Sequence, residues 1–326
     1  MAEQICLVGN PQAGSGQAHN IASAVQERLR ARGFAVRTVR VVAREEVSAL
    51  AESAGAEGET LVAIGGDGII AAAADGLRRA GGGRLGVIPA GRGNDLARTL
   101  GIPRQPTAAC EVIAAGATRA LDLGVIGDRA FIGIASVGFD SEANRAANEA
   151  PAFLGGGAYA YGAMRALARW RPAHFEVIYR EAPLGADGAS QTGARAERFS
   201  FEGYTVALAN TPFYGSGMRV APRARPDDGA LELVTVGRMS RGRFLANLPR
   251  VFHGTHAQLA EVQMARCTEA TVRADRPFVM YADGDPISPL PARVRLLPKA
   301  IEVLAPPLRE SAGAPVERSG TLPANR

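Results

Sequence analysis

The chain has 326 residues, of which 47% are hydrophobic and 21% are charged. Single hydrophobic cores rarely grow beyond about 250 to 300 residues, so a globular chain of this length is expected to form two domains. The net charge is +5 and the only lysine is Lys299, so the positive charge is arginine spread along the chain, which excludes a nucleic-acid-binding tail. Three separated cysteines, Cys6, Cys110 and Cys267, argue against a disulfide framework or a zinc site and fit a reducing cytosol.

The first part of the chain alternates short apolar runs with helical patterns. Strands are predicted at 5–8, 36–42, 61–64 and 85–88, and helices at 21–33, 47–54, 69–79 and 107–115. Strands that alternate with helices indicate a doubly wound parallel sheet. We assign residues 1–122, completed by 298–306, to this α/β domain.

The pattern changes after about residue 119 to strands with few helices between them. Strands are predicted at 120–126, 130–137, 175–180, 203–209 and 231–236, a hairpin-rich segment at 271–297, and helices at 158–170 and near 244–252. We assign residues 123–297 to a β-rich sandwich domain. The segment 307–326 is rich in Gly, Pro, Ser and Arg without periodicity, which predicts a disordered tail.

Three glycine-rich loops follow three of the predicted parallel strands. They are GNPQAGSG at 9–16, GGDG at 65–68 and PAGRGNDLAR at 89–98. Glycines there allow positive φ and close backbone approach, and a helix that starts in such a loop offers unpaired N–H groups to an anion. Because the carboxyl ends of parallel strands meet at one edge, the loops are predicted to form one phosphate-binding crevice. For 65–68 alone, a glycine turn capped by Asp67 is the simpler interpretation.

Two common phosphate-binding motifs do not fit the first loop. Gly9 and Gly14 have the spacing of a Walker A motif, but Ser15 stands where its lysine is required. Gly14 and Gly16 would begin a dinucleotide fingerprint, but His19 occupies the place of its third glycine. Neither motif is therefore predicted here.

In order and spacing, these loops resemble those of the diacylglycerol kinase-type lipid kinases, a family that includes the sphingosine kinases. The matching segments run through nearly the whole chain: NPxxG at 10–14, GGDG at 65–68, 89–98, DLG at 122–124, ASVGFD at 135–140, 210–222, DDG at 227–229 and DGD at 283–285. The resemblance implies an N-terminal nucleotide domain like that of NAD kinases and phosphofructokinases. It also implies a C-terminal β-rich sandwich domain that binds the acceptor.

The same resemblance implies which residues would bind ATP and the catalytic Mg²⁺. The residues that would line the ATP site are Asn10, Pro11, Gln12, Ala13, Gly14, Gly65, Gly66, Asp67, Gly68, Arg92, Asn94 and Asp95. Asp67, Asp95 and Asp122 would form an acidic, water-linked cluster near the phosphates and Mg²⁺, with Asp67 taking part in catalysis.

A structural Mg²⁺ and a general base are also implied by the resemblance. The metal would bind the Asp228 carboxylate and the backbone oxygens of Arg225 and Ala230, since oxygen ligands suit this hard cation. The general base would be Asp285, at the position of the family's glutamate.

Three positions depart from the family pattern. After GGDG the family continues with Thr, Asn and Glu, whereas this chain continues with an apolar run that begins at Ile69. Arg92 stands for a threonine, and Asp285 is one methylene shorter than the family's glutamate. Because phosphoryl transfer is catalysed by positioning and charge neutralisation, Arg92 is expected to contact the phosphates; the alternative is that it blocks the pocket.

The predicted activity is ATP- and Mg²⁺-dependent transfer of a phosphoryl group to a hydroxyl of a lipid such as diacylglycerol. The alternatives are a kinase of a soluble metabolite and a catalytically silent nucleotide- or lipid-binding protein. We expect a cytoplasmic protein without a nucleic-acid partner; a peripheral contact with the inner membrane face and a homodimer are left open. Residues 153–170 are either a glycine-hinged lid with arginines suited to anionic lipid or, more simply, an amphipathic helix packed on the β-rich domain.

Overall fold

The computed structural model describes residues 3–9, 17–41, 43–151, 158–183, 196–215 and 217–307, and its chain divides into two compact units. Unit 1 contains the residues up to Leu123, Ala130–Ile132, and the described residues from Leu297 on. Unit 2 contains Gly124–Arg129 and Gly133–Leu296. The strands β5 (Thr118–Ile126) and β14 (Ala292–Leu304) contribute residues to both units.

Unit 1 is built on a parallel sheet with the strand order β4-β3-β1-β2. The strands are β1 (Gln4–Gly9), β2 (Ala35–Arg40), β3 (Thr60–Gly65) and β4 (Arg84–Pro89). The end of β14 extends the sheet by parallel pairing with β4. Every residue of β3 is buried, which is why this strand reads as a continuous apolar run and not as an alternating one.

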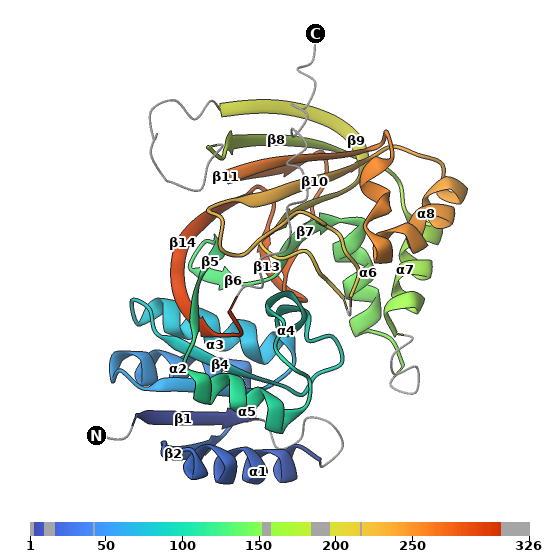
Figure 1. The fold of residues 1–326 in the computed structure, drawn as a ribbon. Coiled ribbons are helices and arrows are strands. Elements are labelled where there is room, and N and C mark those ends of the chain that lie inside the picture. The colour runs from blue at the N-terminus through green and yellow to red at the C-terminus, as the bar shows by residue number, and fades with distance from the viewer. Residues whose placement is uncertain are drawn as a thin grey trace. The chain divides into compact units, whose positions relative to one another are not determined.

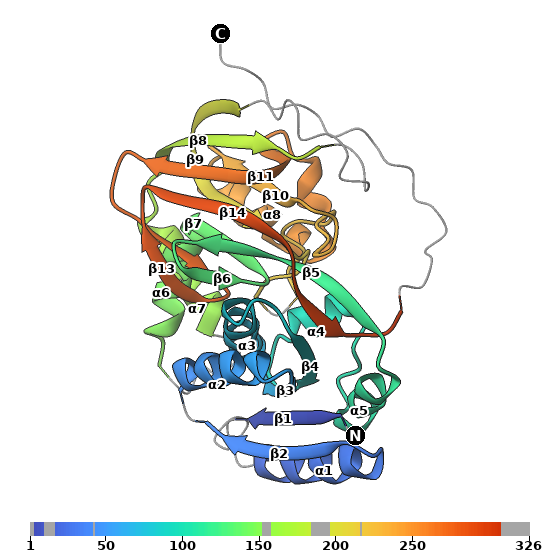
Figure 2. The same ribbon diagram turned by 90° about the vertical axis from the view of Figure 1, so that its left-hand side faces the viewer.

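Helices cover both faces of this sheet. They are α1 (Gln17–Ala31), α2 (Arg44–Ala56), α3 (Asp67–Arg79), α4 (Asp95–Leu100) and α5 (Pro106–Ala115). Figure 2 shows α2 and α3 on one face and α1 and α5 on the other. This follows from right-handed crossovers, because the chain moves from β1 to β2 in one direction and then reverses to reach β3 and β4.

Unit 2 is dominated by antiparallel strands. They are β7 (Ile134–Gly138), β8 (Ala173–Glu181), β9 (Ala196–Ala209), β10 (Leu231–Gly237), β11 (Val262–Ala274), β12 (Val279–Ala282) and β13 (Asp285–Pro289). Burial alternates along β8 and β11, so each turns one face to the core. The helices α6 (Phe139–Asn148), α7 (Ala158–Arg169) and α8 (Arg241–His253) lie together beside these strands (Figure 1).

The predicted fold class is confirmed: a doubly wound parallel sheet precedes a β-rich antiparallel region. The single strand predicted at 130–137 is wrong, because the chain forms β6 (Arg129–Phe131) and then β7. Between them the N–H of Gly133 donates to Asp283 Oδ1 at 3.0 Å, and the N–H of Ile134, at the start of β7, donates to the same oxygen at 3.2 Å.

Helix α6 was not predicted. It begins directly after Gly138, whose φ is 105°, and the Ser141 hydroxyl bonds both the N–H and the carbonyl of Gly138. Its buried apolar residues are Phe139 at the first position and the small Ala143 and Ala146, so it lacks the run of large apolar side chains by which a helix is readily recognised. Within the described ranges, no helix is both long and apolar enough to cross a membrane. The predicted tail, from residue 308 on, lies outside the described residues.

Candidate functional site

The loops that follow β3 and β4 are bonded to each other. The carbonyl of Gly65 accepts from the N–H of Ala90 at 2.9 Å. Asp67, the first residue of α3, accepts from the N–H groups of Asn94 and Asp95 at 2.9 and 2.6 Å. The structure therefore brings two of the three predicted glycine loops into one cluster and joins the start of α3 to the start of α4. Residues 10–14, the third loop's predicted ATP contacts, lie outside the described residues.

The glycines in this cluster allow the backbones of the two loops to approach each other closely. Gly66 has extended backbone, with φ −92° and ψ −175°, so the expectation of positive φ is wrong for this residue. A Cβ added to Gly91 would lie 2.3 Å from Gly66 Cα, and a Cβ on Gly66 would lie 3.1 Å from Gly91 Cα. Side chains cannot fit at that spacing, so the two loops touch backbone to backbone.

Asn94 holds the second loop in shape. It has φ 53° and ψ 47°, a left-handed conformation in which asparagine is enriched. Its Oδ1 accepts from the Gly91 N–H at 2.9 Å, and its Nδ2 donates to the Gly91 carbonyl at 2.6 Å. Asn94 and Asp95 are buried, whereas Arg92, between the two ends of this loop, is exposed and therefore accessible to a ligand.

Asp122 lies on β5 and is 1% exposed. Its Oδ1 accepts from the backbone N–H of Lys299 at 2.8 Å, at a point of β14 where φ is 49°. Among the described residues, no group of three or more His, Cys, Asp and Glu side chains is arranged to hold a metal ion. The acidic, water-linked cluster of Asp67, Asp95 and Asp122 stays a prediction.

Asp285 follows a tight turn between β12 and β13. Asp283 and Gly284 have φ values of 49° and 89°, as a two-residue hairpin turn with positive φ at both central positions requires. The Asp283 carboxylate anchors this turn to the start of β7 through its two backbone hydrogen bonds there. The half-buried Asp285 thus has a defined place in unit 2.

The carboxylate predicted to bind a structural Mg²⁺ is paired with an arginine. Asp228 Oδ2 lies 2.6 Å from the Arg266 guanidinium, and Oδ1 accepts from the Ala230 N–H at 3.2 Å. The Arg225 side chain faces Asp227 at 3.5 Å. The oxygen donors at this turn fit a hard cation in type, but Arg266 competes with a cation for the charge of Asp228.

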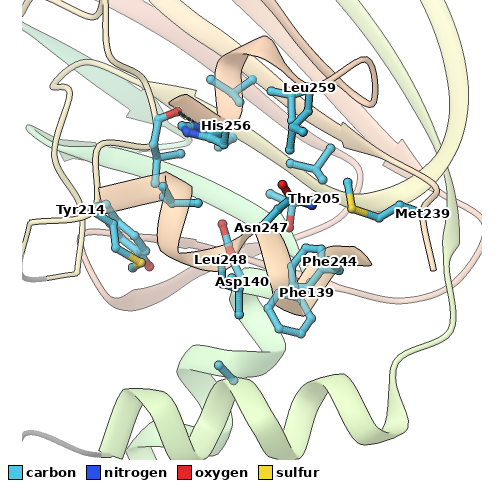
Figure 3. A pocket seen from close by; sticks show the side chains of 18 residues that line it. Phe139, Asp140, Thr205, Tyr214, Met239, Phe244, Asn247, Leu248, His256 and Leu259 are labelled. Atoms are coloured by element: carbon cyan, nitrogen blue, oxygen red, sulfur yellow. Dashed lines mark hydrogen bonds between the residues drawn. The ribbon is translucent and has the colours of Figure 1, made fainter. Parts of the chain in front are cut away.

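An apolar pocket of about 100 Å³ lies within unit 2, and no sequence motif predicted it. Apolar residues form most of its lining, including Ala163 of α7 and Phe244 and Leu248 of α8. Its polar lining residues, labelled in Figure 3, are Asp140, Thr205, Tyr214, Asn247 and His256. They come from segments spread over more than a hundred residues, and only the tertiary structure brings them together.

The polar groups of the pocket are strongly affected by burial. Burial raises the pKa of the Asp140 carboxyl to about 6. It also raises the pKa of the Tyr214 phenol, as does the neighbouring Asp140 charge, while the Tyr214 hydroxyl receives a hydrogen bond from Asn144. Burial lowers the pKa of His256. Figure 3 shows Asp140 between Tyr214 and Phe139, so the pocket presents a carboxyl and a hydroxyl to whatever enters it.

Comparison with known proteins assigns both units. Residues 4–126 match the diacylglycerol kinase catalytic domain, and residues 133–305 match the YegS C-terminal NAD kinase beta sandwich-like domain. A diacylglycerol kinase of Mycobacterium tuberculosis is 34% identical over 316 residues, which cover 93% of this chain and 95% of that protein. A "Probable lipid kinase YegS-like" of Pseudomonas aeruginosa is 31% identical over 79% of each chain.

The crystal structure of a diacylglycerol kinase from Bacillus anthracis has the same fold. It superposes with a TM-score of 0.71 at 17% identity and covers 94% of this chain and 97% of that one. The parallel-sheet domain followed by a β-sandwich domain is the arrangement that the two matching family models describe. The chain belongs to the diacylglycerol kinase and YegS-like lipid kinase family. The resemblance seen in its sequence motifs is thereby confirmed.

Proposed function

We propose that the protein transfers the γ-phosphate of ATP to a hydroxyl group of a lipid such as diacylglycerol. Beside family membership, one observation carries the choice of acceptor: the lining of the apolar pocket in unit 2 includes the Asp140 carboxyl and the Tyr214 hydroxyl. Burying an aliphatic chain there gains roughly 25 cal/mol per Å² of apolar surface, and a lipid's polar group can hydrogen-bond to these two side chains. A water-soluble metabolite would gain little from burial against the apolar wall, so the lipid is favoured as the acceptor.

The pocket has to widen to take a whole acyl chain. At about 100 Å³ it is smaller than the roughly 300 to 1,000 Å³ of typical small-molecule sites. Helix α8 forms one wall and has no buried residue along its length. Because none of its residues is buried, α8 is the element expected to shift outward when a lipid enters.

In this proposal unit 1 binds ATP at the loops after β3 and β4. The N–H groups at the start of α3 attract a phosphate, and the exposed guanidinium of Arg92 supplies a positive charge. Asp67 holds the two loops together through the N–H groups of Asn94 and Asp95. Mg²⁺, when bound, would neutralise phosphate charge, and Asp67, Asp95 and Asp122 offer the oxygen donors that suit it.

Asp285 is proposed to accept the proton of the attacking hydroxyl, directly or through a water molecule. The side chain of Asp285 is one methylene shorter than that of a glutamate. The turn at Asp283 and Gly284 must therefore place the Asp285 carboxylate within reach of the attacking hydroxyl. A positional error of about 1 Å can cost roughly 10²-fold in rate. We therefore expect Asp285→Glu to be as active as the parent or more so.

The test is transfer of label from γ-labelled ATP to a panel of diacylglycerols, other lipid alcohols and water-soluble alcohols. For the parent protein we expect the label to appear in the lipid. For Asp285→Asn we expect at least a 10²-fold loss of turnover and unchanged ATP affinity. Labelling of soluble alcohols alone would favour the metabolite kinase. ATP binding without transfer to any acceptor would favour the catalytically silent protein. Near-normal turnover of Asp285→Asn would move the base to another residue.

A further inference from the structure

The guanidinium of Arg44 lies against the backbone of Gly68, the last glycine of the GGDG loop. A Cβ added to Gly68 would lie 2.5 Å from Arg44 Cζ and 2.9 Å from its Nε, and closer still to Nη2. A side chain at position 68 would therefore have to displace the guanidinium. Arg44 thus reaches the first turn of α3 from a segment that contains none of the phosphate-binding motifs in the sequence.

The order of the elements in unit 1 explains this placement. Arg44 is the first residue of α2, which follows β2, and α3 follows β3. Because both helices follow parallel strands, both begin at the carboxyl edge of the sheet, where the glycine loops lie. Farther along, α2 packs directly on α3, since a Cβ at Gly76 would lie 2.6 Å from Ala51 Cβ. This packing holds Arg44 beside the start of α3.

The first turn of α3 has no basic side chain of its own. Its acidic residue is Asp67, whose carboxylate oxygens both accept backbone N–H groups of the second loop. Gly68 has no side chain, and Ile69 and Ile70 are apolar and turn their N–H groups back to the Gly66 carbonyl at 3.0 and 3.2 Å. Within α3, the N–H groups of Asp67 and Gly68 are therefore what the helix offers to a phosphate.

The position of Arg44 is electrostatically unfavourable unless an anion is present. The start of a helix carries partial positive charge, and Arg44 lies at the start of α2 and beside the start of α3. Glu45 and Glu46 in the first turn of α2 offset part of this charge, and Glu46 also accepts from the Ala43 N–H at 3.4 Å. A phosphate at this point would give the exposed guanidinium and the helix N–H groups a common negative partner.

We propose that Arg44 binds the phosphate chain of the nucleotide at the start of α3, in addition to Arg92 on the loop after β4. The inference rests on the proposed function, because it takes the ligand of these loops to be ATP. Two guanidiniums from different loops supply the positive charge that the first turn of α3 lacks. Each can donate two parallel N–H groups to phosphate oxygens, which an ammonium group cannot do.

A purely structural role for Arg44 predicts a different effect on stability. If the guanidinium served only to pack α2 on α3, Arg44→Gln would destabilise the protein equally with and without ATP. If Arg44 binds phosphate, the variant without ATP should be as stable as the parent or more stable, because a cation leaves two helix starts. The variant should lose only part of the stabilisation that ATP adds. Urea denaturation with and without ATP separates the two roles.

The main test is calorimetric titration of the full-length protein with ATP in the presence of Mg²⁺. We expect Arg44→Gln to lose roughly ten- to a hundredfold in ATP affinity, as for a hydrogen bond to a charged group. Arg44→Lys keeps the charge without the planar fork and should lose less. The control is Arg79→Gln at the opposite end of α3, about 18 Å away along the helix. Arg79 pairs on the surface with Glu52 at 2.9 Å, and its replacement should leave ATP affinity unchanged.

Gly68→Ala tests the placement of the guanidinium. The added methyl group should displace the flexible end of Arg44, and alanine is favoured over glycine within a helix, so the variant should fold. We expect Gly68→Ala to weaken ATP binding, and Arg44→Gln/Gly68→Ala to bind no more weakly than Arg44→Gln alone. Additive losses would show that the methyl group acts on the nucleotide directly and would overturn the placement.

The results that overturn this inference differ from those that overturn the proposed function. ATP affinity of Arg44→Gln equal to that of the parent and of Arg79→Gln would remove Arg44 from the site and leave ATP binding by the loops intact. Equal destabilisation of Arg44→Gln with and without ATP would assign Arg44 a structural role. A parent that binds no ATP would overturn both proposals. Loss of ATP affinity in Arg44→Gln, in a parent that labels no lipid, would count against the lipid kinase alone.

Discussion

The Asp67 carboxylate accepts a hydrogen bond from the backbone N–H of Asp95 at 2.6 Å and so links the first residue of α3 to the first residue of α4. Its second oxygen accepts from the Asn94 N–H at 2.9 Å. Both bonds go to backbone groups, so Asp67 positions the two loops whatever part it takes in catalysis.

Replacement of Asp67 by asparagine should loosen both loops. The amide has one acceptor oxygen, and its NH₂ group would face a backbone N–H. We expect the free energy of unfolding to fall by about 1 to 3 kcal/mol and ATP affinity to fall at least tenfold. Urea denaturation and calorimetric titration with ATP measure the two effects. Asp128→Asn, at an exposed aspartate, is the control; equal behaviour of both variants would refute the positioning role.

A methyl group at Gly91 should separate the two loops. The added Cβ would stand 2.3 Å from Gly66 Cα, so backbone has to shift. We expect Gly91→Ala to cost about 1 to 3 kcal/mol of stability and to abolish most ATP binding, and Gly66→Val to do the same while the protein stays folded. Gly242→Ala provides the control, because a Cβ there meets nothing within 4 Å. Unchanged ATP affinity in both loop variants would contradict the crevice assignment.

Arg92 is exposed on the second loop, and the prediction is that it contacts phosphate. Restoring the threonine of the family pattern, Arg92→Thr, should then weaken ATP binding or slow turnover by roughly ten- to a hundredfold, as expected for loss of a hydrogen bond to a charged group. Titration with ATP and initial rates decide the matter. Tighter binding and faster turnover in the variant would show that Arg92 obstructs the site.

The pairing of Arg266 with Asp228 should make the stability of the parent protein nearly independent of Mg²⁺. Arg266 also stands opposite the buried Glu232 in the β10–β11 pairing. Arg266→Met removes this positive charge, so we expect a loss of about 1 to 3 kcal/mol that added Mg²⁺ partly restores. The matched control is Arg293→Met, whose partner Glu269 forms a surface pair worth at most about 1 kcal/mol. Thermal melts with Mg²⁺ or with EDTA test this; strong EDTA sensitivity of the parent would contradict it.

The half-buried Asp140 carboxyl should make stability fall as the pH rises from about 4 to about 6. Its pKa is about 6 in the folded protein, against about 3.9 when unfolded, so the folded state binds more protons between these values. Asp140→Asn should flatten this dependence, which amounts to at most about 3 kcal/mol. Urea denaturation between pH 4 and pH 8 measures it, with the exposed Asp275→Asn as control. An unchanged slope in Asp140→Asn would show that the carboxyl is well solvated.

The parts of the site that follow from local sequence were predictable. Glycines after β3 and β4, with Asp67 between them, mark loops at the carboxyl ends of parallel strands, and the structure brings these loops together. The turn at Asp283 and Gly284 is likewise local. Sequence did not reveal why Gly66 is needed. Its neighbour in space, Gly91, is distant along the chain, and the residues around Gly66 do not indicate that the two backbones touch.

The apolar runs by themselves determined the α/β class and the change to a β-rich second part, because each depends on periodicity within short segments, and the resemblance of the ordered motifs to a known family indicated the family. Tertiary structure alone decided the partners: Arg266 for Asp228, the backbone of Lys299 for Asp122, and the pocket around Asp140. These contacts join residues far apart along the chain. Burial then set the pKa of Asp140, since desolvation depends on what surrounds a carboxyl in space and not on what flanks it in sequence.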